Sequence, residues 1–170
     1  LTLEWQNRGL NLWTITQETV SQDKDGASLG SDNYLKKGVS TYNIATSTSA
    51  VLDLVLRTDA GVTSSQSDYH LSRISQPTYA AIPNKLTEGR PLQYYLERKE
   101  ILNTTASADQ SSQITLWPIP DQDSKYTIEY WRVKRIADTG NDASQTAGVP
   151  DRFLPALISG LAYQIALKNP

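Results

Sequence analysis

Most of the chain consists of short runs rich in β-branched and aromatic residues, separated by stretches of Gly, Pro, Asn, Asp and Ser. The former side chains suit a pleated sheet, and the latter favour turns. The pattern therefore predicts strands at 10–20, 50–57, 70–74, 93–98, 113–119 and 126–136, with at most one short extended piece within the loops of 21–50, at 38–44. We expect 70–74 to pair with 50–57, and the last three strands to form an antiparallel meander.

The segment 126–130 shows a regular alternation. Tyr126, Ile128 and Tyr130 fall on one face of a strand, and Thr127 and Glu129 fall on the other. The first face is expected to be buried.

Three segments are predicted to be helical. Residues 150–168 place apolar side chains at spacings of three and four, at Phe153, Leu154, Leu157, Ile158, Leu161 and Ile165. Residues 75–82 begin with a capping Ser75 and carry Pro77 in the first turn. Residues 1–8, followed by Gly9, are typical of the end of a helix whose start would precede Leu1, because the sequence begins without Met.

The helix at 150–168 also carries small residues, among them Gly160, which allow another helix to approach closely. It could pack on the sheet, beside the helix at 1–8, or against a neighbouring subunit. The fold class that we predict is α+β, with an antiparallel β-rich domain inserted between N-terminal and C-terminal helices that form a helical bundle. The boundaries are 1–9 for the end of the first helix, 10–149 for the β-rich domain and 150–170 for the last helix, all in one structural unit.

The composition excludes several functions. With 16 basic and 18 acidic residues, the net charge is −2, so no bulk field attracts nucleic acid or an anionic membrane. No cysteine is present, which excludes disulfides, thiolate catalysis and thiolate-ligated zinc. No apolar run reaches the roughly 20 residues of a spanning helix, and we expect no membrane partner.

The residues of familiar active sites are also missing. His70 is the only histidine, and Asp68-Tyr69-His70 would point to alternate faces of a strand rather than converge. No GxSxG, GxxxxGK or GxGxxG motif occurs. Asp121 and Asp123 are better explained by a turn than by a calcium loop. We predict that the chain is not an enzyme and has no catalytic residue, metal or cofactor.

One compact basic cluster comprises Arg132, Lys134 and Arg135, next to Tyr130 and Trp131. Arginine and aromatic side chains together can stack on bases or contact phosphates. The alternative is an exposed strand end whose charges contact acidic protein residues. We favour the second interpretation, and we expect only weak binding of duplex DNA.

Four segments taken in order resemble a known family: 5–13 (WQNRGLNLW), 82–85 with 89–95 (IPNK and GRPLQYY), 116–120 (LWPIP), and 150–157 running into 160–162 (PDRFLPAL and GLA). Their order and spacing are similar to those of the head-to-tail adaptor proteins, or head completion and connector proteins, of tailed and mainly short-tailed bacteriophages. The resemblance spans nearly the whole chain, except that the family has longer helices at both ends.

The resemblance implies a structural virion protein that is made in the host cytoplasm. It would form a ring of itself, expected to contain twelve copies, between the portal protein and a tail tube or nozzle protein. DNA would pass through the channel without sequence-specific binding. The interface residues that we expect are Arg90, Tyr95, Trp117, Arg132, Lys134, Arg135, Arg152, Phe153 and Gly160. The alternative is a β-rich carbohydrate-binding or tail-fibre-type interaction module, and a hydrolase is the weaker rival.

Overall fold

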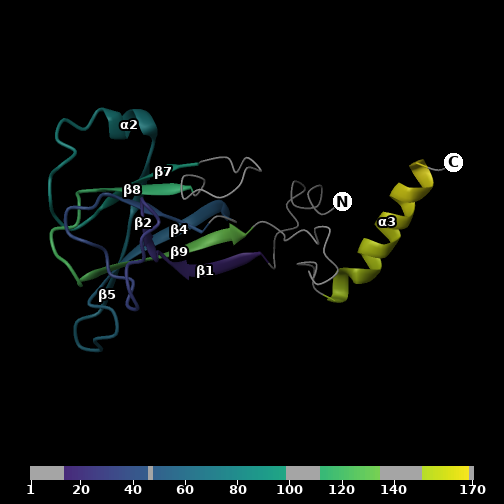
Figure 1. The fold of residues 1–170 in the computed structure, drawn as a ribbon, viewed down its shortest axis with the longest axis horizontal. Coiled ribbons are helices and arrows are strands. Elements are labelled where there is room, and N and C mark those ends of the chain that lie inside the picture. The colour runs from purple at the N-terminus through teal and green to yellow at the C-terminus, as the bar shows by residue number, and fades with distance from the viewer. Residues whose placement is uncertain (1–13, 46–47, 99–111, 135–150, 169–170) are drawn as a thin grey trace.

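The computed structural model of the protein describes residues 14–45, 48–98, 112–134 and 151–168. Its strands form two sheets, and its C-terminal helix lies apart from them (Figure 1). The first sheet has the order β1-β9-β4-β5, and all of its pairs are antiparallel. Its strands are β1 (Ile15–Thr19), β9 (Tyr126–Lys134), β4 (Thr48–Thr58) and β5 (Ser67–His70).

The second sheet has the order β2-β3-β8-β7-β6. Its strands are β2 (Gln22–Asp23), β3 (Thr41–Asn43), β8 (Gln113–Trp117), β7 (Gln93–Glu97) and β6 (Ser72–Ile74). Neighbours in this sheet are antiparallel except β6 and β7, which run parallel.

The two sheets are joined at both edges by strands that bend from one sheet into the other. At one edge β1 continues into β2 around Val20, whose N–H donates to the carbonyl of Ile128 at 2.9 Å. At the other edge β5 continues into β6 around Leu71, whose N–H donates to the carbonyl of Leu54 at 3.0 Å. Both bend residues are buried, so the bends close the sides of the sandwich over the core.

The core lies between the two sheets and takes side chains from both. It contains Val20, Leu35, Tyr42, Ile44, Val51, Leu54, Leu56, Leu71, Tyr94, Leu96, Ile114, Leu116, Tyr126, Ile128 and Tyr130. The predicted buried face of 126–130 is therefore confirmed. Thr127 is buried as well, although it lies on the opposite face of β9.

The predicted meander is wrong in its last strand. β7 and β8 pair as expected, but β9 lies in the other sheet between β1 and β4. The connection after β8 is held by long-range bonds, since Gly38 N–H donates to the carbonyl of Pro120 and Leu35 N–H donates to that of Tyr126. The residue types in the turn predict the turn itself but not these long-range hydrogen bonds. They therefore do not predict which sheet contains the next strand.

Two other strand predictions are corrected in part. The predicted strand 70–74 is divided between the sheets: His70 pairs with Val55 of β4, whereas β6 pairs with β7. The region 21–50 contains β2, β3 and the start of β4, rather than one extended piece. The strand predicted from residue 10 is described from Ile15.

The short helix after β6 is confirmed as α2 (Gln76–Ala80). Ser75 is its N-cap, and the Ser75 hydroxyl accepts from Thr78 N–H. Tyr79 stacks on Tyr95 of β7 with ring centroids 5.8 Å apart, which places α2 over the outer face of the second sheet.

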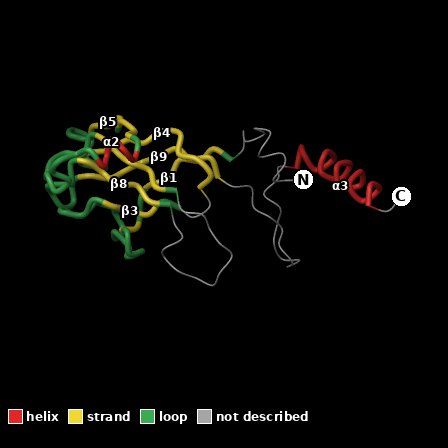
Figure 2. The backbone as a smooth tube through the Cα atoms, turned by 90° about the horizontal axis from the view of Figure 1, so that it is seen from above, coloured by secondary structure: helices red, strands yellow, loops and turns green. Residues whose placement is uncertain are grey.

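The C-terminal helix is confirmed as α3 (Leu154–Lys168), preceded by the 3₁₀ turn η2 (Asp151–Phe153). The predicted fold class is nevertheless wrong, because the fold is mostly β-sheet and not a β domain flanked by a helical bundle. No residue of α3 is buried, and α3 lies beyond the sheets in both views (Figures 1 and 2). Helical periodicity identifies an apolar face but not what that face contacts.

The predicted helix at 1–8 and the predicted domain boundaries at 9/10 and 149/150 lie outside the described residues. Among the helices that are described, none is long and apolar enough to cross a membrane.

Candidate interaction surfaces

Arg90 lies on the loop that leads into β7, and its guanidinium covers an aromatic ring. The Cζ atom is 4.2 Å from the ring centroid of Tyr69 on β5. The loop is fixed next to Arg90, since Gly89 N–H donates to the carbonyl of Ile119 at 2.8 Å and Pro91 is fully buried. Arg90 itself is exposed. A fixed and exposed guanidinium can make directional contacts with a partner at little entropic cost.

Tyr95 and Trp117 lie on the outer face of the second sheet. Trp117 is paired with Gln93, two residues from Tyr95 on the same strand, so the two aromatic side chains are diagonal neighbours. Trp117 Nε1 donates to the carbonyl of Asn84 at 3.1 Å, and both aromatic residues are half-buried. Arg90 thus belongs to the loop of residues 82–92 and Trp117 is bonded to that loop at Asn84, whereas Tyr95 stacks on Tyr79 of α2 and is the diagonal neighbour of Trp117. We call these three residues the loop-side surface.

Arg132 does not lie at an exposed strand end, and that expectation is wrong. It is 3% exposed and forms an ion pair with Glu18 of β1. Its Nη1 also donates to the hydroxyl of Thr48 at 3.2 Å, and the Tyr130 hydroxyl donates to Glu18 at 3.4 Å. Lys134 is exposed, as predicted, and Arg135 lies outside the described residues. The basic cluster is therefore not one surface.

The outer face of the first sheet carries an ion-pair network that the sequence did not indicate. Arg57 donates from Nε and Nη2 to the two carboxylate oxygens of Asp68, at 2.8 and 2.9 Å, and from Nη1 to Glu129 at 2.6 Å. The hydrogen bond from Arg57 lowers the pKa of the Asp68 carboxyl below its ordinary value. Glu129 is 72 positions from Arg57 and Asp68 is 11, and the pairing of β4 with β9 and β5 brings the three side chains together.

The residues Asp68-Tyr69-His70 do not converge on a catalytic centre. Asp68 binds Arg57, whereas the His70 side chain is 76% exposed and its Nδ1 lies 3.2 Å from a carboxylate oxygen of Asp53. Tyr69 lies under Arg90. Each member of the tripeptide thus has a separate partner.

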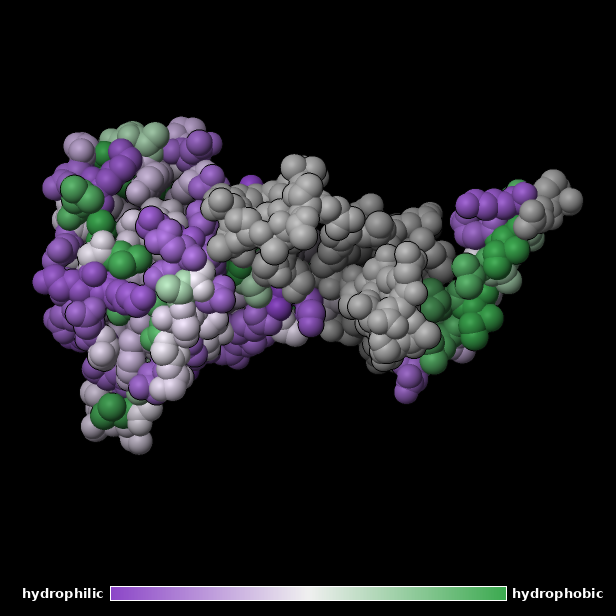
Figure 3. Space-filling view, in the orientation of Figure 1, coloured by the Kyte–Doolittle hydropathy of each residue, from purple (hydrophilic) through white to green (hydrophobic). Residues whose placement is uncertain are grey.

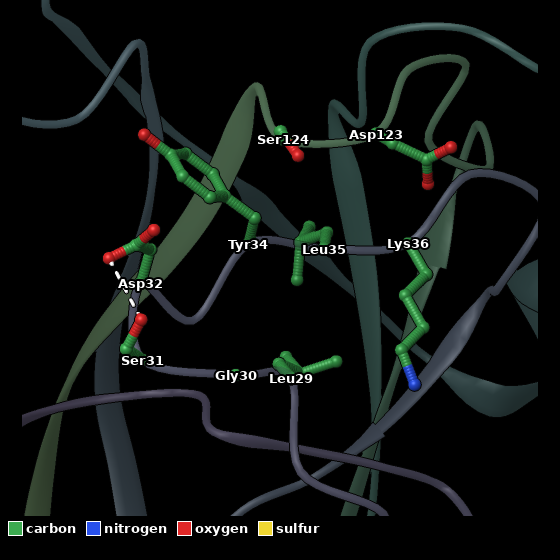
Figure 4. A pocket seen from close by; sticks show the side chains of 9 residues that line it. All are labelled: Leu29, Gly30, Ser31, Asp32, Tyr34, Leu35, Lys36, Asp123 and Ser124. Carbon is green, nitrogen blue, oxygen red and sulfur yellow. Dashed lines mark hydrogen bonds between the residues drawn. The ribbon is translucent and has the colours of Figure 1, made fainter.

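A shallow cleft lies at the loop end of the sandwich (Figure 4). It has a volume of about 240 Å³ and is lined by Leu29, Gly30, Ser31, Asp32, Tyr34, Leu35, Lys36, Asp123 and Ser124. Figure 4 shows Tyr34 and Asp32 on one side, Lys36 on the other, and Leu35 between them.

The charged groups of this cleft are engaged within the fold. Lys36 Nζ donates to Asp23 at 3.0 Å, and a carboxylate oxygen of Asp123 accepts from Lys37 N–H at 2.7 Å. The cleft lining includes no histidine. These hydrogen bonds hold the loops together. The lining of the cleft contains no imidazole that could act as a base for a serine hydroxyl.

Asp121 and Asp123 form structural hydrogen bonds around the β8–β9 turn. Asp121 accepts from the hydroxyl of Tyr126 at 2.8 Å, and burial, together with this carboxylate, raises the pKa of Tyr126 to about 12. The preference for a turn over a calcium loop agrees with these contacts. Within the described ranges, no three His, Cys, Asp or Glu side chains gather where they could hold a metal ion.

The remaining predicted interface residues lie at the C-terminal end. Arg152 and Phe153 belong to η2, and Gly160 lies within α3. Apolar side chains gather along α3, which projects away from the polar β domain (Figure 3). The exposed ones are Leu154, Ile158, Leu161, Tyr163, Ile165 and Leu167.

Comparison with known proteins gives one family. The family model described as SU10 adaptor protein matches residues 15–170, which include every described strand as well as α3. A search of curated proteins found no match.

Proposed function

The chain belongs to the SU10 adaptor protein family, a family of phage head-tail adaptors, and we propose that it forms a ring that joins the portal to the tail. Membership makes it a structural virion component that interacts with head and tail parts of the phage. The ring, its expected twelve copies, the portal and tail nozzle as direct partners, and the passage of DNA are our proposal. The observation that carries it is the family match, which extends from β1 through α3.

The division of the chain into a closed β domain and a projecting helix supports this proposal. In the β domain, both sheets contribute side chains to one core, and bent strands close the core at both edges. A domain built in this way is suited to act as a rigid unit of an assembly. The helix leaves its apolar side chains exposed, and such exposed apolar surfaces mark interaction sites. In a ring of such subunits, the β domain would be the rigid part and α3 would contact another protein.

We propose the loop-side surface of Arg90, Tyr95 and Trp117 as a contact with tail or neighbouring proteins. Arg, Tyr and Trp are the residue types that most often dominate interface energetics. We propose a second contact region at the C-terminal end, at Lys134, Arg135, Arg152, Phe153 and Gly160. Arg132 is left out of both, because its side chain is buried beside Glu18.

DNA would pass through the ring without strong binding. Each neutralised phosphate adds to the salt-dependent affinity, and tight binding would slow the passage of DNA. The net charge of −2 and the engagement of Arg57 and Arg132 with carboxylates both support a channel that does not grip DNA.

The proposal is tested by mixing the full chain with purified portal rings and with tail nozzle protein, then imaging the particles by electron microscopy. We expect a collar of density between portal and nozzle. Arg90→Ala should weaken nozzle binding, whereas Arg98→Ala, a change of an exposed arginine outside the loop-side surface, should not. A folded chain that binds neither portal nor nozzle would contradict the proposal.

A further inference from the structure

β1 forms one edge of the first sheet, and its outer side has unpaired backbone groups. In the order β1-β9-β4-β5, the only neighbour of β1 is β9. The Thr14 carbonyl accepts from Lys134 N–H at 2.7 Å. Bonds of this kind use alternate residues of an antiparallel pair. The intervening residues Ile15, Gln17 and Thr19 therefore direct their N–H and C=O groups away from the sheet.

β5 forms the opposite edge of the same sheet. Leu71 N–H donates to the carbonyl of Leu54 at 3.0 Å where β5 ends. By the same alternation, Asp68 and His70 direct their backbone groups away from β4. Within the described ranges, no hydrogen bond joins the outward backbone groups of β1 or β5 to another part of the fold. Unpaired edge groups are a template for pairing with another chain.

The two edges are complementary because the first sheet has four strands and all of its pairs are antiparallel. β1 and β5 therefore run in opposite directions. Their outward backbone groups also belong to residues whose side chains lie on the same face. Gln17 lies opposite Trp131 and Asp68 lies opposite Arg57, and both partners point away from the core. An odd number of strands would fail both conditions.

We propose that β1 of one copy pairs with β5 of the next copy, so that the first sheet continues from copy to copy. In the register that uses both edges, Gln17 lies opposite His70 of the next copy, and Thr19 lies opposite its Asp68. The pairing is antiparallel, and the outer faces of the two sheets stay on one side. The inference rests on the proposed function and names the contact that would hold the ring.

The side chains that meet in this register are compatible. On the outer face, the neutral Gln17 and Thr19 lie opposite His70 and Asp68, so no like charges are opposed. On the core side, Glu18 lies opposite Tyr69 of the next copy, whose ring is covered by the Arg90 guanidinium. The exposed Arg90 thus lies on the same side of the sheet as the Glu18 carboxylate, whose side chain is 35% exposed. These opposite charges favour the contact.

A contact between two different edges of identical subunits is heterologous, and it closes into a ring when the rotation permits. Pairing of β1 with β1 would instead stop at a dimer. Four strands spaced about 4.8 Å apart add about 19 Å per copy, so twelve copies would enclose a circle about 37 Å in radius. A sheet that continues around the ring is therefore compatible with a central channel.

The absence of native cysteine allows a direct test by cross-linking in the full chain. One chain carries both Gln17→Cys and His70→Cys. Within one copy these positions are three strand spacings apart, or about 14 Å, whereas a disulfide requires Cα atoms within about 7 Å. Mild oxidation of the assembled chains should therefore give a ladder of covalent oligomers on non-reducing electrophoresis. The last step of the ladder should be the closed ring.

Two controls test the specificity of this cross-link. Gln17→Cys combined with Leu86→Cys should give no ladder, because Leu86 is 78% exposed but lies on the loop of residues 82–92. Gln17→Cys alone should give no dimer, because β1 is expected to meet β5 and not another β1.

A proline variant separates assembly from folding. Gln17→Pro removes an N–H that points away from β9, so circular dichroism and the thermal midpoint should stay close to those of Gln17→Ala. Gln17→Ala keeps the N–H and is the matched control. Ring particles should be at least tenfold fewer for Gln17→Pro than for Gln17→Ala. If Gln17→Pro fails to fold, the cross-link alone decides.

The outcomes distinguish the contact from the function. A ladder confined to the chain with Gln17→Cys and His70→Cys, together with loss of rings in folded Gln17→Pro, supports the contact. Dimers of Gln17→Cys alone would show that β1 pairs with itself and would overturn it. Wild-type rings without a ladder in the double variant would overturn the contact and leave the adaptor function standing. If wild-type chains form no rings even with portal, both are wrong.

Discussion

Arg132 and Glu18 form an ion pair at the edge of the core, although 114 positions separate them in the chain. Arg132 lies on β9 and Glu18 on β1, so the pair fastens an edge strand of the first sheet to a central one. The Arg132 side chain is almost fully buried, whereas Glu18 retains access to water. The pair therefore serves the fold of the subunit.

Replacing Arg132 should destabilise the subunit. We expect Arg132→Met to lower the free energy of unfolding by about 1–3 kcal/mol, because Glu18 and Thr48 lose a charged donor. Lys134→Met changes an exposed lysine on the same strand and should stay within about 0.5 kcal/mol. Urea unfolding of both variants measures the difference. Equal stability of the two variants would show that the pair contributes nothing.

Two glycines should respond differently to alanine. Gly38 has φ +74°, a conformation that L residues avoid, so Gly38→Ala should cost about 1–2 kcal/mol. Gly89 lies outside that region, and an added Cβ would meet Pro118 Cβ at an ordinary 3.5 Å. Gly89→Ala should therefore be nearly neutral in thermal unfolding. A large loss at Gly89 would mean that its loop has a conformation other than the one described.

Stability should fall in acid partly through Asp68. Its pKa is lowered by the hydrogen bond from Arg57, so the folded protein holds this carboxylate charged below the ordinary value of 3.8. The stabilisation is present above that value and is lost as the pH falls through the lower folded pKa. Between about pH 5 and pH 2.5, wild type should lose more stability than Asp68→Asn. Salt at about 1 M should shrink the difference, and parallel pH profiles would contradict it.

Duplex DNA should bind only weakly to the isolated chain. The net charge is −2, and two of the described arginines, Arg57 and Arg132, are already paired with carboxylates. Fluorescence anisotropy at about 0.15 M salt, where the Debye length is about 8 Å, should give no saturable binding at micromolar protein. Tight binding that weakens steeply with salt and is lost in Lys134→Glu would instead indicate that the chain grips DNA.

The sequence predicted the local structure well. Ser75 and Pro77 predicted α2 because a cap acts within one turn. The alternation of Tyr126, Ile128 and Tyr130 predicted the buried face of β9 because side chains alternate along any strand. The spacing of apolar residues predicted α3 because helical periodicity is also a local property of the sequence.

The pairing of β9 could not be predicted from the sequence. β9 joins β1 and β4 rather than β8, and nothing near Pro120 or Asp123 encodes that choice. Arg132 was expected at an exposed strand end because alternation sends the basic residues of 132–135 to different sides of the strand. Its partner Glu18 can be identified only once the strand register is known. The motifs around Arg90, Tyr95 and Trp117 pointed to residues of which Arg90 and Trp117 are held at the loop of residues 82–92, and the interface role of all three stays a prediction.

The proposed function depends above all on ring formation, which imaging together with a mass measurement can decide. The full chain, alone and with portal, is examined by electron microscopy and by native mass spectrometry. We expect closed rings with a single copy number of twelve that lie coaxially under the portal. Monomers that stay folded and never associate with portal, at concentrations where the portal itself is assembled, would contradict it.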